Sequence, residues 1–137
     1  MISLFFGLPR CGKTTVACKL AKKYVKQGRP VYVNFPCKID GVTHIQNEWI
    51  GKYDMSNGVI IIDEASIYAD SRSYKKFSTQ LVEFFCLHGH WGCDILLFTQ
   101  IYNRVDSTIR MMAEQVYMVR KKQNITTPMT MQTEKLN

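Results

Sequence analysis

Hydrophobic residues along the chain follow two alternating patterns. Short apolar runs rich in β-branched and aromatic residues predict five strands, and a further short run at Val42–Ile45 is compatible with one more. The five runs cover residues 2–6, 31–35, 59–63, 94–99 and 115–119. Between them, apolar residues recur at helical spacing, which predicts helices over residues 13–27, 73–88 and 107–113. This alternation is typical of an α/β fold, a doubly wound, mostly parallel five-stranded sheet with helices on both faces.

Turn-forming residues mark the ends of these elements. Gly28 and Pro30 end the first helix, and Asn57-Gly58 is a turn signal ahead of the strand that ends at Asp63. Past Asn124 the sequence turns to Thr, Met, Gln and Lys, which predicts a loose polar tail. We therefore expect one compact domain over residues 1–124, followed by a C-terminal tail at 125–137.

A glycine-rich motif directly follows the first strand. Residues 7–14 read GLPRCGKT and fit the pattern G-x-x-x-x-G-K-[ST] between a predicted strand and a predicted helix. In such a loop the backbone N–H groups surround a phosphate, Lys13 supplies a positive charge and the Thr14 hydroxyl is offered to Mg²⁺. The helix start adds its positive dipole end. The motif predicts a P-loop NTPase that binds ATP and Mg²⁺ through Gly7, Leu8, Pro9, Arg10, Cys11, Gly12, Lys13, Thr14 and Thr15.

Two neighbouring carboxylates end the most apolar strand. Asp63 and Glu64 follow the run Val59–Ile62, the composition of a buried parallel strand whose carboxyl end faces a ligand crevice. We expect Asp63 to lie beside Mg²⁺ and Glu64 to polarise the attacking water as general base. The alternative is an acidic cap that faces solvent.

Gln100 follows another predicted strand. If that strand lies between the phosphate-loop strand and the Asp63 strand, the Gln100 amide would reach toward the γ-phosphate and the attacking water. A polar cap at the end of the strand is the alternative interpretation.

Composition narrows the class of protein further. No stretch approaches the ~18 to 20 apolar residues of a membrane span, and the N-terminus lacks the features of a signal peptide, so we expect a cytoplasmic protein. The 5 cysteines include no C-x-x-C pair, which argues against a zinc ribbon and predicts reduced, mostly buried thiols.

The chain is basic, with a formal net charge of +7. Its basic residues gather at 19–29 and 120–122, with Arg72, Lys75 and Lys76 between these clusters. The positive electrostatic field of such a chain attracts nucleic acid or an anionic membrane surface. For the first cluster, the solvated face of an amphipathic helix is the simpler interpretation.

The segment from Gly58 to Lys122 resembles the zonula occludens toxin family, which includes the assembly and export ATPases of filamentous phages. With the phosphate loop, the resemblance covers about nine tenths of the chain. It is carried by the strand with Asp63-Glu64, Ser71-Arg72-Ser73-Tyr74, Leu87-His88-Gly89-His90-Trp91-Gly92, Asp94-Ile95, Thr99-Gln100, Asp106, Arg110 and the strand Val116–Arg120.

This resemblance implies an ATPase that drives extrusion of phage single-stranded DNA while coat subunits assemble around it. It also implies a homo-oligomer at the inner face of the host inner membrane. Membrane contact would come through a partner or a downstream segment, because family members usually continue into a transmembrane helix.

Arg72 and Arg110 are candidate stabilisers of the charge that phosphoryl transfer develops, in their own site or in a neighbour's. For Arg110, a surface ion pair with Asp106 four residues earlier is an alternative.

Two other functions are compatible with the sequence. A small nucleoside kinase of the thymidine-kinase type also combines a phosphate loop with an Asp-Glu strand end, although such kinases carry a zinc lobe with paired cysteines. A module that binds ATP without hydrolysing it is the other alternative.

Overall fold

The computed structural model describes residues 1–8, 10–64, 71–88, 92–124 and 127–136. Two short 3₁₀ turns, Asn47–Trp49 and Tyr102–Arg104, lie in its connections. Its helices and strands are β1 (Ile2–Phe6), α1 (Lys13–Lys26), β2 (Val31–Val33), β3 (Val42–His44), β4 (Val59–Asp63), α2 (Ser71–His88), β5 (Asp94–Thr99), α3 (Ser107–Met112), β6 (Gln115–Asn124) and β7 (Thr127–Leu136).

The strands form one seven-stranded sheet with the order β3-β2-β4-β5-β1-β6-β7. All neighbours are parallel except β6 and β7, which are antiparallel. The α/β class and the mostly parallel sheet are confirmed, whereas the count of five strands is too low. The short run at Val42–Ile45 forms β3, whose pairing to β2 involves only three residues of each strand.

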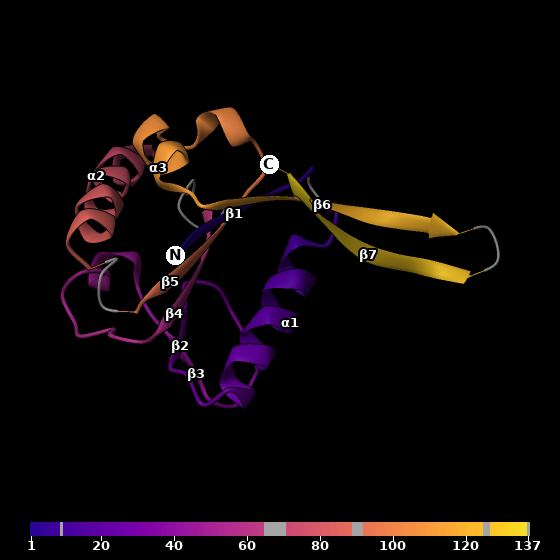
Figure 1. The fold of residues 1–137 in the computed structure, drawn as a ribbon, viewed down its shortest axis with the longest axis horizontal. Helices are drawn as coiled ribbons and strands as arrows, with labels where there is room; N and C mark the ends of the chain where they lie inside the picture. Colours follow the sequence, from indigo (N-terminus) through magenta and orange to yellow (C-terminus); the bar gives the residue numbers. More distant parts are fainter. Residues whose placement is uncertain (9, 65–70, 89–91, 125–126, 137) are drawn as a thin grey trace.

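The C-terminal region differs most from expectation. β6 runs to Asn124 instead of ending at Val119, and Thr127–Leu136 forms β7 where we expected a loose tail. Polar residues there lack the apolar alternation of a half-buried strand, so pattern alone cannot reveal the pairing. The antiparallel ladder between β6 and β7 supplies partners for their backbone groups. Figure 1 shows this hairpin projecting beyond the rest of the sheet.

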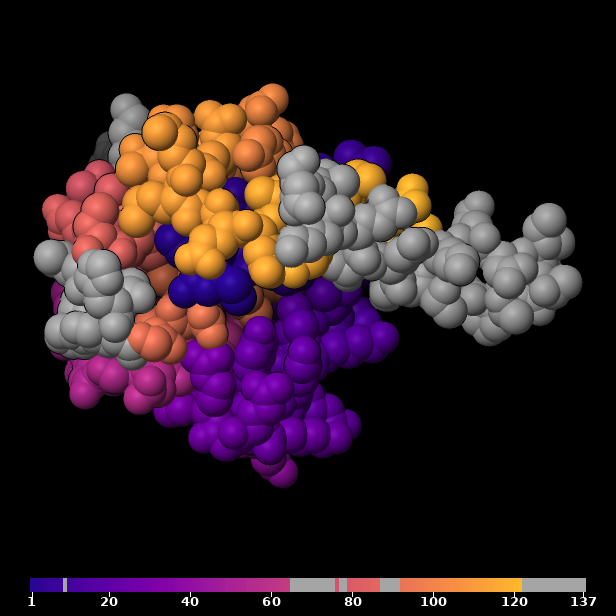
Figure 2. Space-filling model, in the orientation of Figure 1, coloured from indigo at the N-terminus to yellow at the C-terminus, as the bar shows by residue number. Residues whose placement is uncertain are grey.

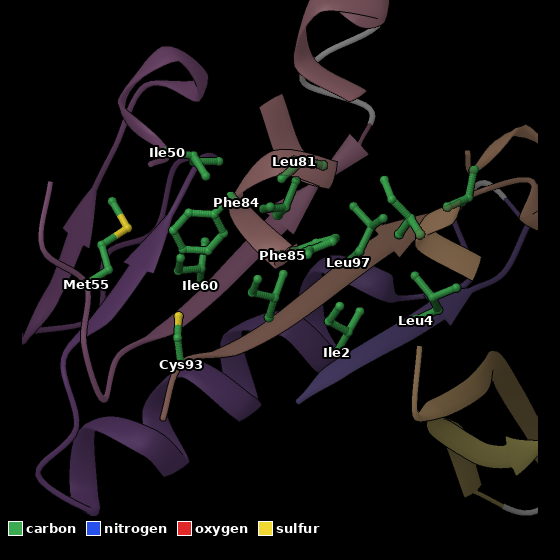
Figure 3. Close-up of a cluster of buried hydrophobic side chains, with 14 of the residues drawn as sticks. Ile2, Leu4, Ile50, Met55, Ile60, Leu81, Phe84, Phe85, Cys93 and Leu97 are labelled. Carbon is green, nitrogen blue, oxygen red and sulfur yellow. The ribbon is translucent and has the colours of Figure 1, made fainter. Parts of the chain in front are cut away.

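Buried side chains cover both faces of the sheet, since successive residues of a strand point to opposite sides. In β4, Ile60 and Ile62 belong to the core beneath α2 and α3, whereas Val59 and Ile61 belong to the core beneath α1. Figure 3 shows the first of these cores, in which Leu81, Phe84 and Phe85 of α2 lie over the strands. α1 lies on the opposite side of the sheet from α2 and α3 (Figure 1). The continuous apolar runs of the sequence are explained by this burial on both faces.

Arg29 ties together the amino ends of the central strands. Its guanidinium donates hydrogen bonds to the carbonyls of Asn57, Gly58 and Gly92 at 3.0, 3.2 and 3.0 Å, and it pairs with Asp94 at 2.5 Å. The N-terminal ammonium group lies 3.2 Å from the same carboxylate. Arg29 belongs to the first basic cluster. Its role is therefore structural, at the amino ends of the strands and remote from the phosphate loop.

Within the described residues, none of the helices is long and apolar enough to cross a membrane.

Candidate functional site

The phosphate loop begins where β1 meets its two neighbouring strands. Phe6 lies beside Thr99 of β5 on one side and Met118 of β6 on the other, and the Gly7 N–H donates to the Thr99 carbonyl at 3.2 Å. A Cβ at Gly7 would lie 2.4 Å from the Val119 carbonyl oxygen. Glycine is therefore required at this position because the neighbouring backbone leaves no room for a side chain.

The second motif glycine sets the start of α1. Gly12 has a φ of 96°, in the left-handed region that side chains disfavour, and α1 begins at the next residue. α1 carries no acidic residue in its first turn, so its positive dipole end is not neutralised locally. This geometry fits the phosphate binding that the motif predicts.

Lys13 reaches back over the loop from the start of α1. Its Nζ atom donates to the carbonyls of Gly7 at 2.6 Å and Leu8 at 2.9 Å. The ammonium group is thus held inside the loop by neutral acceptors, where an anionic phosphate oxygen would be a stronger partner.

A cleft of about 530 Å³ opens over the carboxyl ends of the strands. It brings the phosphate loop and the start of α1 together with residues that lie in or just beyond β2, β4, β5 and β6. Its described lining consists of Arg10, Gly12, Lys13, Thr14, Thr15, Ala17, Phe35, Asp63, Phe98, Gln100 and Lys121. Three groups that the sequence predicts separately, namely the phosphate loop, Asp63 and Gln100, therefore share one cleft.

The other motif residues have different positions. Gly7 lies under the loop, and Cys11 is buried in the core below α1. Leu8 is 77% exposed, and Pro9 lies outside the described residues. Only part of the motif thus faces the cleft with its side chains.

The strand order explains why Gln100 reaches this cleft. β5 lies between β1 and β4, the arrangement on which our expectation for Gln100 depended. In the ladder, Asp63 lies beside Phe98, two residues before Gln100. The Thr99 hydroxyl accepts from the Ile101 N–H at 3.3 Å and so braces the turn that carries Gln100.

Asp63 is positioned by Asn34, which sequence reasoning missed. The Asn34 side chain accepts from the Asp63 N–H at 2.7 Å and donates to the Asp63 carbonyl at 3.2 Å. It also donates to the Asn47 side chain at 3.0 Å. Asn34 directly follows β2, the strand that pairs with β4. This position of a polar residue at a strand end is the signal that could have identified it.

Lys121 is a second residue that the sequence did not single out individually. It is exposed, lies in the part of β6 beyond the predicted strand end, and lines the cleft. The basic cluster at 120–122 was the only signal for Lys121 in the sequence. Its place at the cleft becomes visible only because β6 extends beyond the predicted strand end.

Two of the other predicted catalytic residues, Glu64 and Arg110, are absent from the described lining of this cleft. Glu64 is only 3% exposed and is absent from the described lining. Arg110 lies on α3 with its guanidinium 5.5 Å from the centre of the Tyr102 ring. Asp106 caps α3 by accepting from the Thr108 N–H at 2.8 Å, and no ion pair with Arg110 occurs in the described part of the chain. The side chain of Arg72 lies outside the described residues.

The oxygen donors in the cleft suit a magnesium ion. Thr14 and Asp63 both line it, and Mg²⁺ is usually held by one or two protein oxygens together with substrate phosphates and water. Among the residues that the structure describes, no group of three or more His, Cys, Asp and Glu side chains could hold a metal. His90 and its neighbours at 89–91 lie outside this set.

The cysteines are all free, but fewer are buried than we expected. Cys11 and Cys93 are buried, Cys18 and Cys37 are half-buried, and Cys86 is exposed. Burial, followed by the neighbouring Cys37 thiol, raises the pKa of Cys18. The thiol form of Cys18 is therefore favoured beside the phosphate loop.

Comparisons with known structures agree with this fold. A structure of the N-terminal domain of zonular occludens toxin from Neisseria meningitidis aligns with a TM-score of 0.56 and 20% identity, covering 96% of this chain and 82% of that one. A KaiC-like protein from Pyrococcus horikoshii aligns with a TM-score of 0.62 and 14% identity, covering 96% and 77%. At these identities the structures establish the fold.

A search of curated protein sequences gave no significant match. The family model described as "Zonular occludens toxin (Zot)" matches residues 35–135, which include Asp63, Gln100 and Lys121. The phosphate loop precedes the matched region and completes the same cleft. The chain therefore belongs to the zonular occludens toxin family.

Proposed function

We propose that this protein is an ATPase that couples ATP hydrolysis to the extrusion of phage single-stranded DNA and to virion assembly. The observation that carries the hydrolytic part is the single cleft shared by the phosphate loop, Asp63 and Gln100. The DNA and assembly part rests on membership of the family. The proposed site of action is the inner face of the host inner membrane, reached through a partner or a downstream segment.

Lys13 is the residue that the incoming phosphates engage. In the structure its ammonium group is satisfied by the carbonyls of Gly7 and Leu8. ATP binding would exchange these neutral acceptors for β- and γ-phosphate oxygens, which form stronger charge-assisted hydrogen bonds. Thr14 and Asp63 would hold Mg²⁺, which neutralises charge on the phosphates when bound.

We propose that two residues, Gln100 and Glu64, act on the attacking water. Gln100 lines the cleft and can orient a water by hydrogen bonding, while Glu64 is the carboxylate that can accept its proton. Glu64 is buried one residue beyond the cleft-lining Asp63, so its role requires its carboxylate to turn toward the bound nucleotide. Hydrogen bonds of a catalytic base often tighten only once substrate is bound.

The proposal is tested by following phosphate release from Mg²⁺-ATP. The wild-type chain should release phosphate, and Lys13→Ala should abolish release and weaken nucleotide binding while leaving the fold intact, because it removes the charge on the β- and γ-phosphates. Undiminished turnover in a folded Lys13→Ala protein would end the ATPase assignment.

The same assay separates the alternatives when thymidine or single-stranded DNA is added. A nucleoside kinase would transfer phosphate to thymidine, and a binding module would bind ATP without turnover. An export ATPase should hydrolyse ATP, and we expect single-stranded DNA to change its rate.

We further propose that the enzyme works as a homo-oligomer in which Arg72 or Arg110 completes a neighbour's site. Arg110 lies outside the described lining of its own cleft, which is compatible with action on a neighbour. Mixing tests this: an arginine-deficient subunit and a Glu64-deficient subunit, each inactive alone, should recover activity together. Hydrolysis by a monomer at a rate independent of concentration would refute it.

A further inference from the structure

One face of α1 carries a concentrated positive charge that the nucleotide site does not use. Lys19, Lys22, Lys23 and Lys26 are all exposed; the pairs 19/22 and 23/26 are three residues apart, and the pairs 19/23 and 22/26 are four residues apart. At that spacing neighbouring Cβ atoms are about 5–6 Å apart, so the four ammonium groups form one patch. We call these four residues the α1 lysine face.

No acidic residue of α1 offsets this charge. Asp40, the first acidic residue of the chain, follows Ile39, which lines a hollow together with Lys19 and Lys22, but Asp40 forms no ion pair with these lysines in the described part of the chain. In the part of the chain that the structure describes, no ion pair involves the α1 lysine face. Four like charges at i, i+3 and i, i+4 spacing repel one another and destabilise a helix slightly. A polyanion laid along the face would relieve that repulsion.

The face is hollowed and continuous with the nucleotide cleft. One hollow of about 440 Å³ is lined by all four lysines and Gln27. A second, of about 340 Å³, is lined by Thr14, Thr15, Cys18, Lys19, Lys22 and Ile39. The hollows share Lys19 and Lys22, and the second shares Thr14 and Thr15 with the nucleotide cleft. Figure 2 shows the violet atoms that include α1 uncovered along the lower side of the molecule.

The charge density fits a nucleic-acid strand. Lys19 to Lys26 spans about 10 Å at the ~1.5 Å rise of a helix, a length over which one strand of a DNA duplex carries about three phosphates. No large hydrophobic side chain of α1 is exposed, because its apolar face is buried against the sheet. An interfacial membrane helix would present such side chains, and base stacking would need exposed aromatic residues.

We propose that the α1 lysine face binds the phosphodiester backbone of single-stranded DNA without reading its bases. This inference deepens the proposed function and rests on its DNA substrate. The continuity of the face with Thr14 and Thr15 places the bound strand next to the phosphate loop, at the helix whose first residues contact the nucleotide.

The test is the anisotropy of a fluorescein-labelled 20-nucleotide oligothymidylate titrated with the full chain between 50 and 200 mM NaCl. Four phosphate contacts predict a log–log salt slope of about −3 for the wild-type chain. Lys22→Gln/Lys26→Gln should weaken binding by about tenfold or more at low salt and make the slope shallower by about 1.4. Lys19→Gln/Lys23→Gln should cause the same loss of affinity and the same change of slope.

A matched control removes the same charge elsewhere. Lys52 and Lys76 are exposed lysines outside α1, and Lys52→Gln/Lys76→Gln should leave both affinity and slope near wild type. Equal losses in this variant and the α1 variants would show a net-charge effect and overturn the proposal. Unchanged binding in both α1 variants would overturn it as well.

Two further measurements distinguish the remaining outcomes. Phosphate release without DNA should be unchanged in the α1 variants, so a wild-type chain that hydrolyses ATP yet binds no oligonucleotide would refute the DNA surface and leave the ATPase standing. Binding to vesicles of phosphatidylglycerol and phosphatidylcholine tests whether the face binds a membrane instead. Lysine-dependent binding to them without binding to the oligonucleotide would assign the face to a membrane and overturn the proposal.

Discussion

Asn34 and Asp63 are joined by two reciprocal hydrogen bonds across neighbouring strands. The Asn34 side chain accepts from the Asp63 N–H at 2.7 Å and donates to the Asp63 carbonyl at 3.2 Å. Asn34 is buried, at 7% exposure, so its side of these bonds is largely shielded from water. They secure the backbone of the residue that we assign to Mg²⁺.

Asn34→Ala should both destabilise the protein and loosen the metal site. It leaves the Asp63 N–H without its side-chain acceptor, which costs about 1–3 kcal/mol in a buried position. Urea unfolding should show this loss, and ATP hydrolysis should need more Mg²⁺. Asn47→Ala is the matched control, because Asn47 bonds only to Asn34 within this group. If the two variants lose equal stability and neither changes the Mg²⁺ dependence, Asn34 has no positioning role.

Asp63→Asn and Glu64→Gln should have separable effects. Asp63→Asn should chiefly raise the Mg²⁺ concentration required, since a neutral amide is a weaker ligand than a carboxylate. Glu64→Gln should leave Mg²⁺-ATP bound but slow hydrolysis by ~10² or more, the scale of a lost general base. Metal titrations of phosphate release check both. The same shift in metal dependence for both variants would contradict the division of roles.

Gly7→Ala should disrupt the phosphate loop. The added Cβ would meet the Val119 carbonyl at 2.4 Å and the Cys11 Sγ at 2.6 Å, and the backbone atom cannot move aside cheaply. We expect nucleotide affinity, measured with a fluorescent ADP analogue, to fall by about tenfold or more, with a lower melting temperature. Gly28→Ala is the control, since its Cβ would have no atom within 4 Å. It should cost only about 1–2 kcal/mol for a side chain in the left-handed region, with little effect on nucleotide affinity.

Lys121→Gln should weaken ATP binding without destabilising the fold. Lys121 is exposed and lines the cleft, so its loss should reduce affinity by about fivefold, the upper range for one solvent-exposed charge contact. Lys13→Ala should have a much larger effect, because Lys13 sits inside the loop. Calorimetric titration of ATP into each protein gives the comparison, with Lys52→Gln as control. Wild-type affinity in Lys121→Gln would remove Lys121 from the site.

Cys93 should make folding sensitive to alkaline pH. Burial and then the Asp94 charge raise the pKa of Cys93 from 9.0 to about 11. The folded state therefore binds the thiol proton more tightly than the unfolded state, so this contribution is complete below pH 9 and is lost as the pH rises toward 11. Urea unfolding at pH 8 and pH 11 should show a steeper decline for wild type than for Cys93→Ala. Parallel declines would contradict the assigned shift.

Local pattern was sufficient to predict the elements around the cleft. The apolar runs of β1, β4 and β5 are buried on both faces, and burial of that kind requires continuous hydrophobic residues. The glycines, Lys13 and Thr14 of the phosphate loop all lie within eight consecutive residues. The motif can therefore be recognised without knowledge of the rest of the chain. The sequence by itself thus determined the fold class, the phosphate loop and Asp63 as the acid at a strand end.

Tertiary structure decided which distant residues join them. Strand order brings Gln100 into the same cleft as Asp63, and pairing of β2 with β4 brings Asn34 to the Asp63 backbone. Pairing with β7 extends β6 so that Lys121 reaches the cleft. The polar residues of β7 carry no strand pattern that would have predicted this pairing. Such relationships depend on which strands become neighbours, a choice made by long-range packing and hydrogen bonding that no short stretch of sequence encodes.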